Sequence, residues 1–190
     1  MEKTTGKIVS WAKAKEQVNA WKKSGAKVVF TNGCFDLVHL GHVDYLEKAR
    51  NLGDKLILGL NSDSSVARFK GPERPLQDEN SRARVLAAMQ FIDLVVLFNE
   101  DTPLALISEL VPDILVKGSD YLTENIVGAD VVKRAGGVVK TIDFVSGYST
   151  TRIVEKIKKN INKYDYGIWA INYYGFLYAG GLDCKLAPKE

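Results

Sequence analysis

The sequence predicts an α/β fold of the Rossmann-like, doubly wound type: a parallel sheet of five strands with helices on both faces, followed by an aromatic-rich C-terminal extension. Two observations predict it. Short apolar runs alternate with helical segments along most of the chain, as they do in βαβ units. The apolar runs are also continuous, without an apolar–polar alternation, which is typical of strands that are covered on both faces.

The sequence predicts one loop and a series of helices and strands. A helix is expected over residues 10–23 because Ser10 is a favourable N-cap. Residues 67–75 carry basic, Gly and Pro residues and are expected to form a loop over the end of the sheet. Apolar runs predict strands at residues 27–31, 55–61, 94–98, 114–117 and 138–142. Helices are expected at residues 41–51, 80–90, 103–110 and 149–160.

Residues 1–160 are expected to form one domain, and residues 161–190 an extension of unassigned role. Residues 164–178 contain seven aromatic residues, which suits a segment that packs on its own domain or on a partner chain. The charge balance, 26 basic against 23 acidic residues, is too even to indicate nucleic acid or a membrane surface. Two cysteines without a CxxC pattern and no signal-peptide-like N-terminus lead us to expect a cytoplasmic protein.

Both histidines of the chain, His39 and His42, lie in the segment GCFDLVHLGHVDYL, where the first strand gives way to a helix. Residues three apart share a helix face, so both imidazoles can point at one spot before the helix N-terminus. The free N–H groups and partial positive charge at that spot attract phosphate. Gly41 has no side chain, so a ligand can approach the backbone closely. The pattern favours a cradle for a phosphate chain.

Two other interpretations of the histidine pair stay open. The pair can be half of a metal site, although a zinc site usually needs three or four protein ligands. With no third histidine in the chain, a carboxylate or Cys34 would have to complete the set. The pair can also be two surface histidines that bind nothing. We predict no metal-ligand set.

Other polar clusters follow the predicted strands, at the sheet edge where ligands bind in doubly wound folds. Three hydroxyl residues open the last helix, where a hydroxyl is a common N-cap for purely structural reasons. Because the histidine motif belongs to the same sheet, we interpret them as a second phosphate-binding group. The basic segment is expected to bring Lys70 onto anions. The other cluster residues are Lys117, Gly118 and Asp120 after the fourth strand, and Ser149, Thr150 and Thr151 at the last helix.

The segment GCFDLVHLGHVDYL resembles the HxGH signature of the nucleotidyltransferase superfamily that includes the cytidylyltransferases. ERPLQDENSRARVLAAMQFIDLVVLFNEDTP, DILVKGSDY and GYSTTRIVEKI resemble one branch, the bacterial D-glycero-β-D-manno-heptose 1-phosphate adenylyltransferases. The resemblance covers about residues 27–158. In many bacteria this activity is one half of a bifunctional protein with a sugar kinase, and here a stand-alone form is expected.

The resemblance implies a reaction in which ATP and a sugar 1-phosphate give an ADP-sugar and pyrophosphate, with Mg²⁺ carried by the nucleotide phosphates. It implies that His39 and His42 stabilise the transition state and that Lys70 closes over the triphosphate. It implies a nucleotide site lined by Thr31, Asn32, Gly33, Cys34, Phe35, Gly41, Arg82, Lys117, Gly118, Asp120, Ser149, Thr150 and Thr151. The implied acceptor site comprises Asp36, Asn61, Asp63 and Arg68, with Asp36 placing the acceptor or the metal. The superfamily often forms dimers, so a homodimer is one expected assembly.

The chain departs from the wider superfamily at two places. Cytidylyltransferases carry an Arg-Tyr-Val-Asp stretch where this chain has Gln90-Phe91-Ile92-Asp93, and Tyr148 stands where a smaller residue is expected. Three rival functions remain at this stage. They are a cytidylyltransferase acting on a polyol phosphate such as glycerol 3-phosphate, an adenylyltransferase acting on pantetheine phosphate or FMN, and a nucleotide-binding module that does not catalyse.

Overall fold

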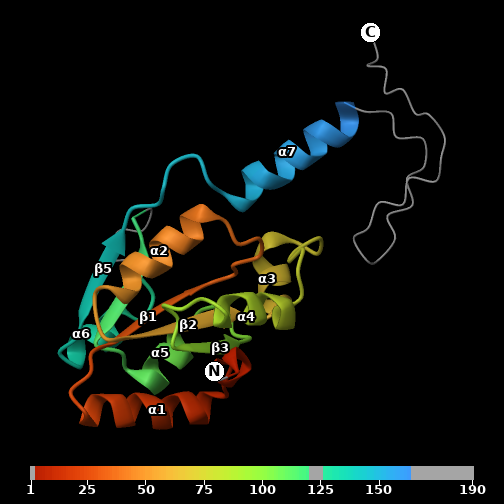
Figure 1. Ribbon diagram of the computed structural model, residues 1–190. Helices are drawn as coiled ribbons and strands as arrows, with labels where there is room; N and C mark the ends of the chain where they lie inside the picture. The colour runs from red at the N-terminus through yellow and green to blue at the C-terminus, as the bar shows by residue number, and fades with distance from the viewer. Residues whose placement is uncertain (1–2, 120–125, 164–190) are drawn as a thin grey trace. The chain divides into compact units, whose positions relative to one another are not determined.

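The computed structural model describes residues 3–119 and 126–163 (Figure 1). The chain divides into two compact units, Met1–Tyr148 and Ser149–Glu190, and each is described by itself. The predicted boundary after residue 160 stays a prediction, and residues 164–190 of the predicted aromatic extension lie outside the described residues.

The first unit contains a five-stranded parallel sheet in the order β3-β2-β1-β4-β5. β1 is central and pairs with both β2 and β4, so the strand order reverses beside β1. In doubly wound folds this reversal is where ligands bind, beyond the carboxyl ends of the strands. The strands are β1 Val28–Gly33, β2 Lys55–Asn61, β3 Leu94–Phe98, β4 Ile114–Gly118 and β5 Val138–Ile142. The predicted fold class and all five predicted strands are confirmed.

Helices connect the strands. Ser10 caps α1 as predicted, since its hydroxyl accepts a hydrogen bond from the Lys13 N–H at 3.3 Å. The described elements are the 3₁₀ helix η1 Thr4–Lys7 and the helices α1 Trp11–Lys23, α2 Leu40–Arg50, α3 Asp63–Lys70, α4 Glu79–Ala87, α5 Leu104–Leu110 and α6 Ala129–Arg134. The second unit contributes α7 Thr150–Lys163. No described helix combines the length and the apolar composition that crossing a membrane requires.

The prediction of a loop at residues 67–75 was wrong for residues 67–70, because these four residues belong to helix α3. Ser62 starts the helix, because its hydroxyl accepts a hydrogen bond from the Ser65 N–H at 3.2 Å. Gly71 ends it with φ 96°, a conformation that glycine adopts readily. Lys70 is therefore the last residue of a helix and not part of a loose loop. The short α6 and η1 were also not predicted.

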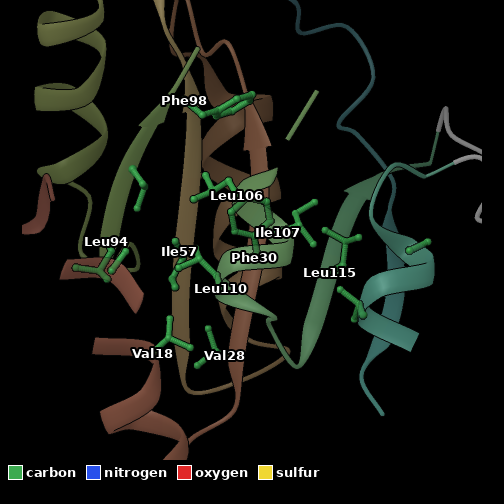
Figure 2. Close-up of a cluster of buried hydrophobic side chains, with 14 of the residues drawn as sticks. Val18, Val28, Phe30, Ile57, Leu94, Phe98, Leu106, Ile107, Leu110 and Leu115 are labelled. Atoms are coloured by element: carbon green, nitrogen blue, oxygen red, sulfur yellow. The ribbon is translucent and has the colours of Figure 1, made fainter. Parts of the chain in front are cut away.

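Two separate cores cover the two faces of the sheet. On one face α1, α5 and α6 pack over Phe30, Ile57 and Leu115, which are all fully buried (Figure 2). On the other face α2 and α4 pack over Val29 and its neighbours. Successive residues of β1 therefore point into different cores, which confirms the prediction of helices on both faces.

Gly59 in β2 gives a test of this packing. A Cβ atom at Gly59 would lie 2.8 Å from Cζ of Phe30 and 3.1 Å from Cβ of Asn32. Gly59→Ala is therefore expected to lower the free energy of unfolding by about 1–3 kcal/mol through overpacking. Chemical denaturation would measure this, with Gly6→Ala as control because nothing lies within 4 Å of its added Cβ. Equal stability of the two variants would contradict the packing described.

Candidate active site

The two histidines lie at the switch point of the sheet, in the connection from β1 to α2. His39 is the N-cap residue of α2, with extended backbone angles of φ −142° and ψ 171°, and His42 lies in the first turn. Their rings stack, with centroids 3.8 Å apart and planes inclined by 19°. Local sequence thus brings both imidazoles to the helix N-terminus, where backbone N–H groups and the helix dipole favour an anion.

Gly41 makes this stacking possible. A Cβ at Gly41 would lie 3.1 Å from Nδ1 and 3.2 Å from Cε1 of His39. The space that the glycine leaves is therefore occupied by the His39 ring. This is a different use of Gly41 from the close ligand approach that the sequence suggested.

Burial controls the protonation of both imidazoles. The pKa of His42 is lowered to about 4, mainly by burial and also by the positive charges of His39 and Lys70, against a backbone hydrogen bond with Leu37 that raises it. Burial also lowers the pKa of His39. Both rings are therefore neutral near pH 7 in the protein without ligand.

Lys70 brings the positive charge of this site. It is exposed at the end of α3, and its charge reaches His42. Burial raises the pKa of the Cys34 thiol, and the positive charge of Lys70 opposes that rise. The charge of Lys70 thus acts at the histidine motif, while its role as a catalytic residue stays a prediction. A lysine ammonium beside a helix N-terminus is suited to a phosphate chain.

Arg82 of α4 holds three chain segments together from inside the protein. The residue is 1% exposed. Its guanidinium donates hydrogen bonds to the carbonyl oxygens of Cys34 at 2.6 Å, Asn61 at 2.9 Å and Gln77 at 3.0 Å. It also pairs with Oδ1 of Asp63 at 2.7 Å. These contacts join the ends of β1 and β2 to the start of α4, while binding of a nucleotide by Arg82 stays a prediction.

Asp36 is almost fully buried and is engaged through both carboxylate oxygens. Oδ1 accepts hydrogen bonds from the N–H groups of Leu76 at 2.7 Å and Gln77 at 3.1 Å. Oδ2 lies 2.6 Å from Nη2 of Arg74. The carboxylate therefore joins the histidine-bearing loop to the segment between α3 and α4. Arg74 was not predicted as a site residue, although its place in the basic segment before Pro75 was a signal.

The other predicted residues of the first unit mostly make contacts within the protein. Lys117 donates to Oδ1 of Asn32 at 2.5 Å, which joins the ends of β4 and β1. The hydroxyl oxygens of Thr31 and Tyr45 share a hydrogen bond of 2.7 Å. This contact fixes α2 on the central strand, and the sequence reasoning had not singled out Tyr45.

The predicted acceptor residues at the end of β2 and in α3 behave in the same way. Nδ2 of Asn61 donates to Oγ of Ser65 at 3.0 Å, and Nε of Arg68 lies 2.7 Å from Oδ1 of Asp101. The Arg68 pair is exposed, so it leaves the guanidinium accessible to solvent. Their contact with an acceptor stays a prediction.

The hydroxyl cluster belongs to the second unit. Oγ of Ser149 accepts a hydrogen bond from the Arg152 N–H at 3.1 Å, as an N-cap does. Convergence of Ser149, Thr150 and Thr151 with the histidine pair stays a prediction, because the two units are described separately. Asp120 lies outside the described residues. Over residues 3–119 and 126–163 no three His, Cys, Asp or Glu side chains gather as a metal site would require.

Residues 30–156 match the model of the cytidylyltransferase-like family. The chain therefore belongs to this family, and the resemblance seen in the HxGH segment is confirmed. The chain is 61% identical to the bifunctional protein HldE of Magnetococcus marinus over an aligned stretch of 151 residues. The stretch covers 80% of this chain and 31% of that protein. The chain spans about a third of the length of the curated relatives it matches.

Two solved structures are similar to this one. The lipopolysaccharide core biosynthesis protein from Thermoplasma volcanium matches with a TM-score of 0.53 and 32% identity, over 66% of this chain and 100% of that chain. The pantoate-β-alanine ligase from Francisella tularensis matches with a TM-score of 0.52 and 16% identity, over 85% of this chain and 81% of that chain. The second likeness shows the fold alone.

Replacement of the buried Arg82 is expected to destabilise the folded protein. Arg82→Met would leave the Asp63 carboxylate unpaired and the carbonyls of Cys34, Asn61 and Gln77 without this donor. We expect the free energy of unfolding to fall by about 3–5 kcal/mol in chemical denaturation. Arg84→Met, an exposed change on the same helix, is the control and should cost less than about 1 kcal/mol. Similar losses in both variants would rule out the buried contacts as the cause.

Acid is expected to destabilise the protein through His42. Its pKa is about 4 when folded and about 6.5 when unfolded, so the unfolded chain takes up the proton first. This contribution to stability is complete above pH 6.5 and is lost as the pH falls toward 4, by roughly 3 kcal/mol. Urea denaturation across this range should show a smaller loss for His42→Asn than for the original protein. The opposite order would contradict a neutral, buried His42.

Proposed function

We propose that the chain is an adenylyltransferase that transfers AMP from ATP to D-glycero-β-D-manno-heptose 1-phosphate, giving ADP-heptose and pyrophosphate. The observation that carries the proposal is the stacked pair His39–His42 at the N-terminus of α2, with the charge of Lys70 reaching it. The 61% identity to a bifunctional protein HldE and the family of the chain support the choice of reaction. The similarity to the lipopolysaccharide core biosynthesis protein of Thermoplasma volcanium supports a role in building lipopolysaccharide sugars.

In the proposed reaction, a phosphate oxygen of the sugar 1-phosphate attacks the α-phosphorus of ATP in line. The bond from the α-phosphorus to the bridging oxygen breaks, and pyrophosphate leaves with that electron pair. The attacking phosphate is already anionic, so no general base is needed. The protein's task is to position the reactants and to stabilise the charge that develops on the phosphate oxygens.

The histidine pair and Lys70 can perform this task as hydrogen-bond donors. A neutral imidazole donates from one nitrogen, and a nearby phosphate raises its pKa and favours the doubly donating form. Lys70 adds a full positive charge from the end of α3. We further propose that the hydroxyls of Ser149, Thr150 and Thr151 bind the phosphates from α7, and that Lys117 and Gly118 line the nucleotide.

Magnesium fits this proposal as an ion carried by the nucleotide. Mg²⁺ prefers phosphate and carboxylate oxygens, and both oxygens of Asp36 already hold Arg74, Leu76 and Gln77. With no three-residue acidic or histidine cluster among the described residues, the phosphates would supply most of the ligands. Bound there, the ion would neutralise part of the phosphate charge. We also propose that the protein forms a homodimer and that it is located in the cytoplasm.

Loss of either histidine should affect turnover far more than folding. His39→Ala and His42→Ala each remove a donor aimed at the developing charge, so kcat is expected to fall by roughly 10²–10³-fold. Pyrophosphate release with ATP and heptose 1-phosphate measures this. Glu47→Ala, an exposed change on the same helix, is the control and should keep normal turnover. Near-normal kcat in either histidine variant would remove the role assigned to the pair.

The choice of substrates is tested by the same assay with a panel. Pyrophosphate release with ATP and heptose 1-phosphate, and much less with CTP, is the expected result. Faster release with CTP and glycerol 3-phosphate would favour a cytidylyltransferase instead. Release with pantetheine phosphate or FMN would favour another adenylyltransferase, and nucleotide binding without release under any acceptor would favour a binding module.

A further inference from the structure

The rings of the histidine motif are packed in a column that begins with Phe35. The Phe35 ring meets His42 edge-on, with centroids 5.0 Å apart and planes inclined by 60°. His42 stacks on His39 at 3.8 Å, and His39 fills the space beside Gly41. We call Phe35, His42 and His39 the ring column. Each ring restricts the orientation of its neighbour, so the orientation of the His42 ring depends on Phe35.

The local backbone places Phe35 in this column. Its φ is 45°, in the left-handed region that residues other than glycine seldom adopt and that persists only where the surroundings fix it. Gly33, two residues earlier, leaves the space in which the Phe35 ring packs. A Cβ at Gly33 would lie 3.0 Å from Cε2 of Phe35. The sequence G-x-F therefore turns the chain back so that an apolar ring lies between the end of β1 and the first turn of α2.

We propose that Phe35 is a positioning residue for the histidine pair. Its ring holds the His42 imidazole in one orientation and shields it from water, so that the pair meets a phosphate in a single arrangement. Phe35 offers no hydrogen-bonding group of its own, so it leaves the nitrogens of His42 to other partners. The catalytic part of this proposal rests on the adenylyl transfer proposed above.

This role differs from the nucleotide-lining role that the resemblance implied. Phe35 is only 6% exposed, so little of its ring is available to a nucleotide. Its contacts are instead directed inward, to His42 and to the space over Gly33. The two roles make different predictions. A lining residue affects nucleotide affinity, whereas a positioning residue affects the histidine and the turnover number.

The histidine can be observed directly because the chain has two histidines. The Hε1 signals of the ¹³C-labelled protein can be followed by NMR against pH without any nucleotide, and loss of a signal in His39→Gln assigns them. In Phe35→Leu the pKa of His42 is expected to rise from about 4 toward 6.5, because water reaches the ring. His39 and Lys70, the charged or titratable groups that act on His42, are unchanged. Phe30→Leu removes a fully buried ring from the other core and should leave the titration as it was.

Gly33→Ala tests the column by an independent route. The added methyl group would crowd Phe35 without changing any ring, so a smaller rise in the His42 pKa is expected. Gly6→Ala is its control, because nothing lies within 4 Å of that added Cβ. An unchanged His42 titration in folded Gly33→Ala and Phe35→Leu would overturn the proposal. If Phe35→Leu does not fold, the glycine variant alone decides.

Turnover separates positioning from nucleotide binding. In Phe35→Leu we expect kcat to fall on the order of 10²-fold, as for a reacting group displaced by about 1 Å, with KM for ATP little changed. A raised KM with normal kcat would instead support the lining role and overturn the proposal. If the original protein releases no pyrophosphate with any acceptor, the proposed function fails. The NMR titration then still decides whether Phe35 positions His42.

Discussion

The buried guanidinium of Arg82 is the interaction on which the ligand-binding end of the sheet depends. A cation that is 1% exposed is tolerated only where acceptors replace water, and here three carbonyl oxygens and one carboxylate do so. The carbonyls belong to the ends of β1 and β2 and to the segment before α4. One side chain therefore sets the position of the histidine loop relative to α3, the helix that ends at Lys70.

Three successive residues after β1 each anchor the loop that carries the histidine pair. The carbonyl of Cys34 accepts from Arg82, the ring of Phe35 packs on His42, and the carboxylate of Asp36 holds the segment at residues 74–77. Backbone, ring and charge each make a different contact. The loop that precedes the histidine pair is therefore tied on three sides, although it contains no regular secondary structure. Such anchoring is what a site needs when it must stabilise charge without reorganising.

The sequence predicted the parts of the fold that local pattern determines. Continuous apolar runs located the five strands, and the spacing of His39 and His42 placed both rings at one helix N-terminus. It did not reveal α3, because basic residues and a following Gly and Pro obscured the Ser62 cap. It also could not show why Asp36 is present. The partners of that carboxylate lie about 40 residues further along the chain, and only the fold brings them together.

Neutral histidines at a phosphate site have a consequence for the whole catalytic cycle. Without ligand, burial and the charges of His39 and Lys70 keep His42 neutral, so the site holds less positive charge than its residues could supply. In the proposed reaction the incoming phosphates raise the imidazole pKa, and the pair becomes a stronger donor when it is needed. Once pyrophosphate has left, the imidazole pKa falls again and the rings return to the neutral form, so the stronger donor is present only while the phosphates are bound.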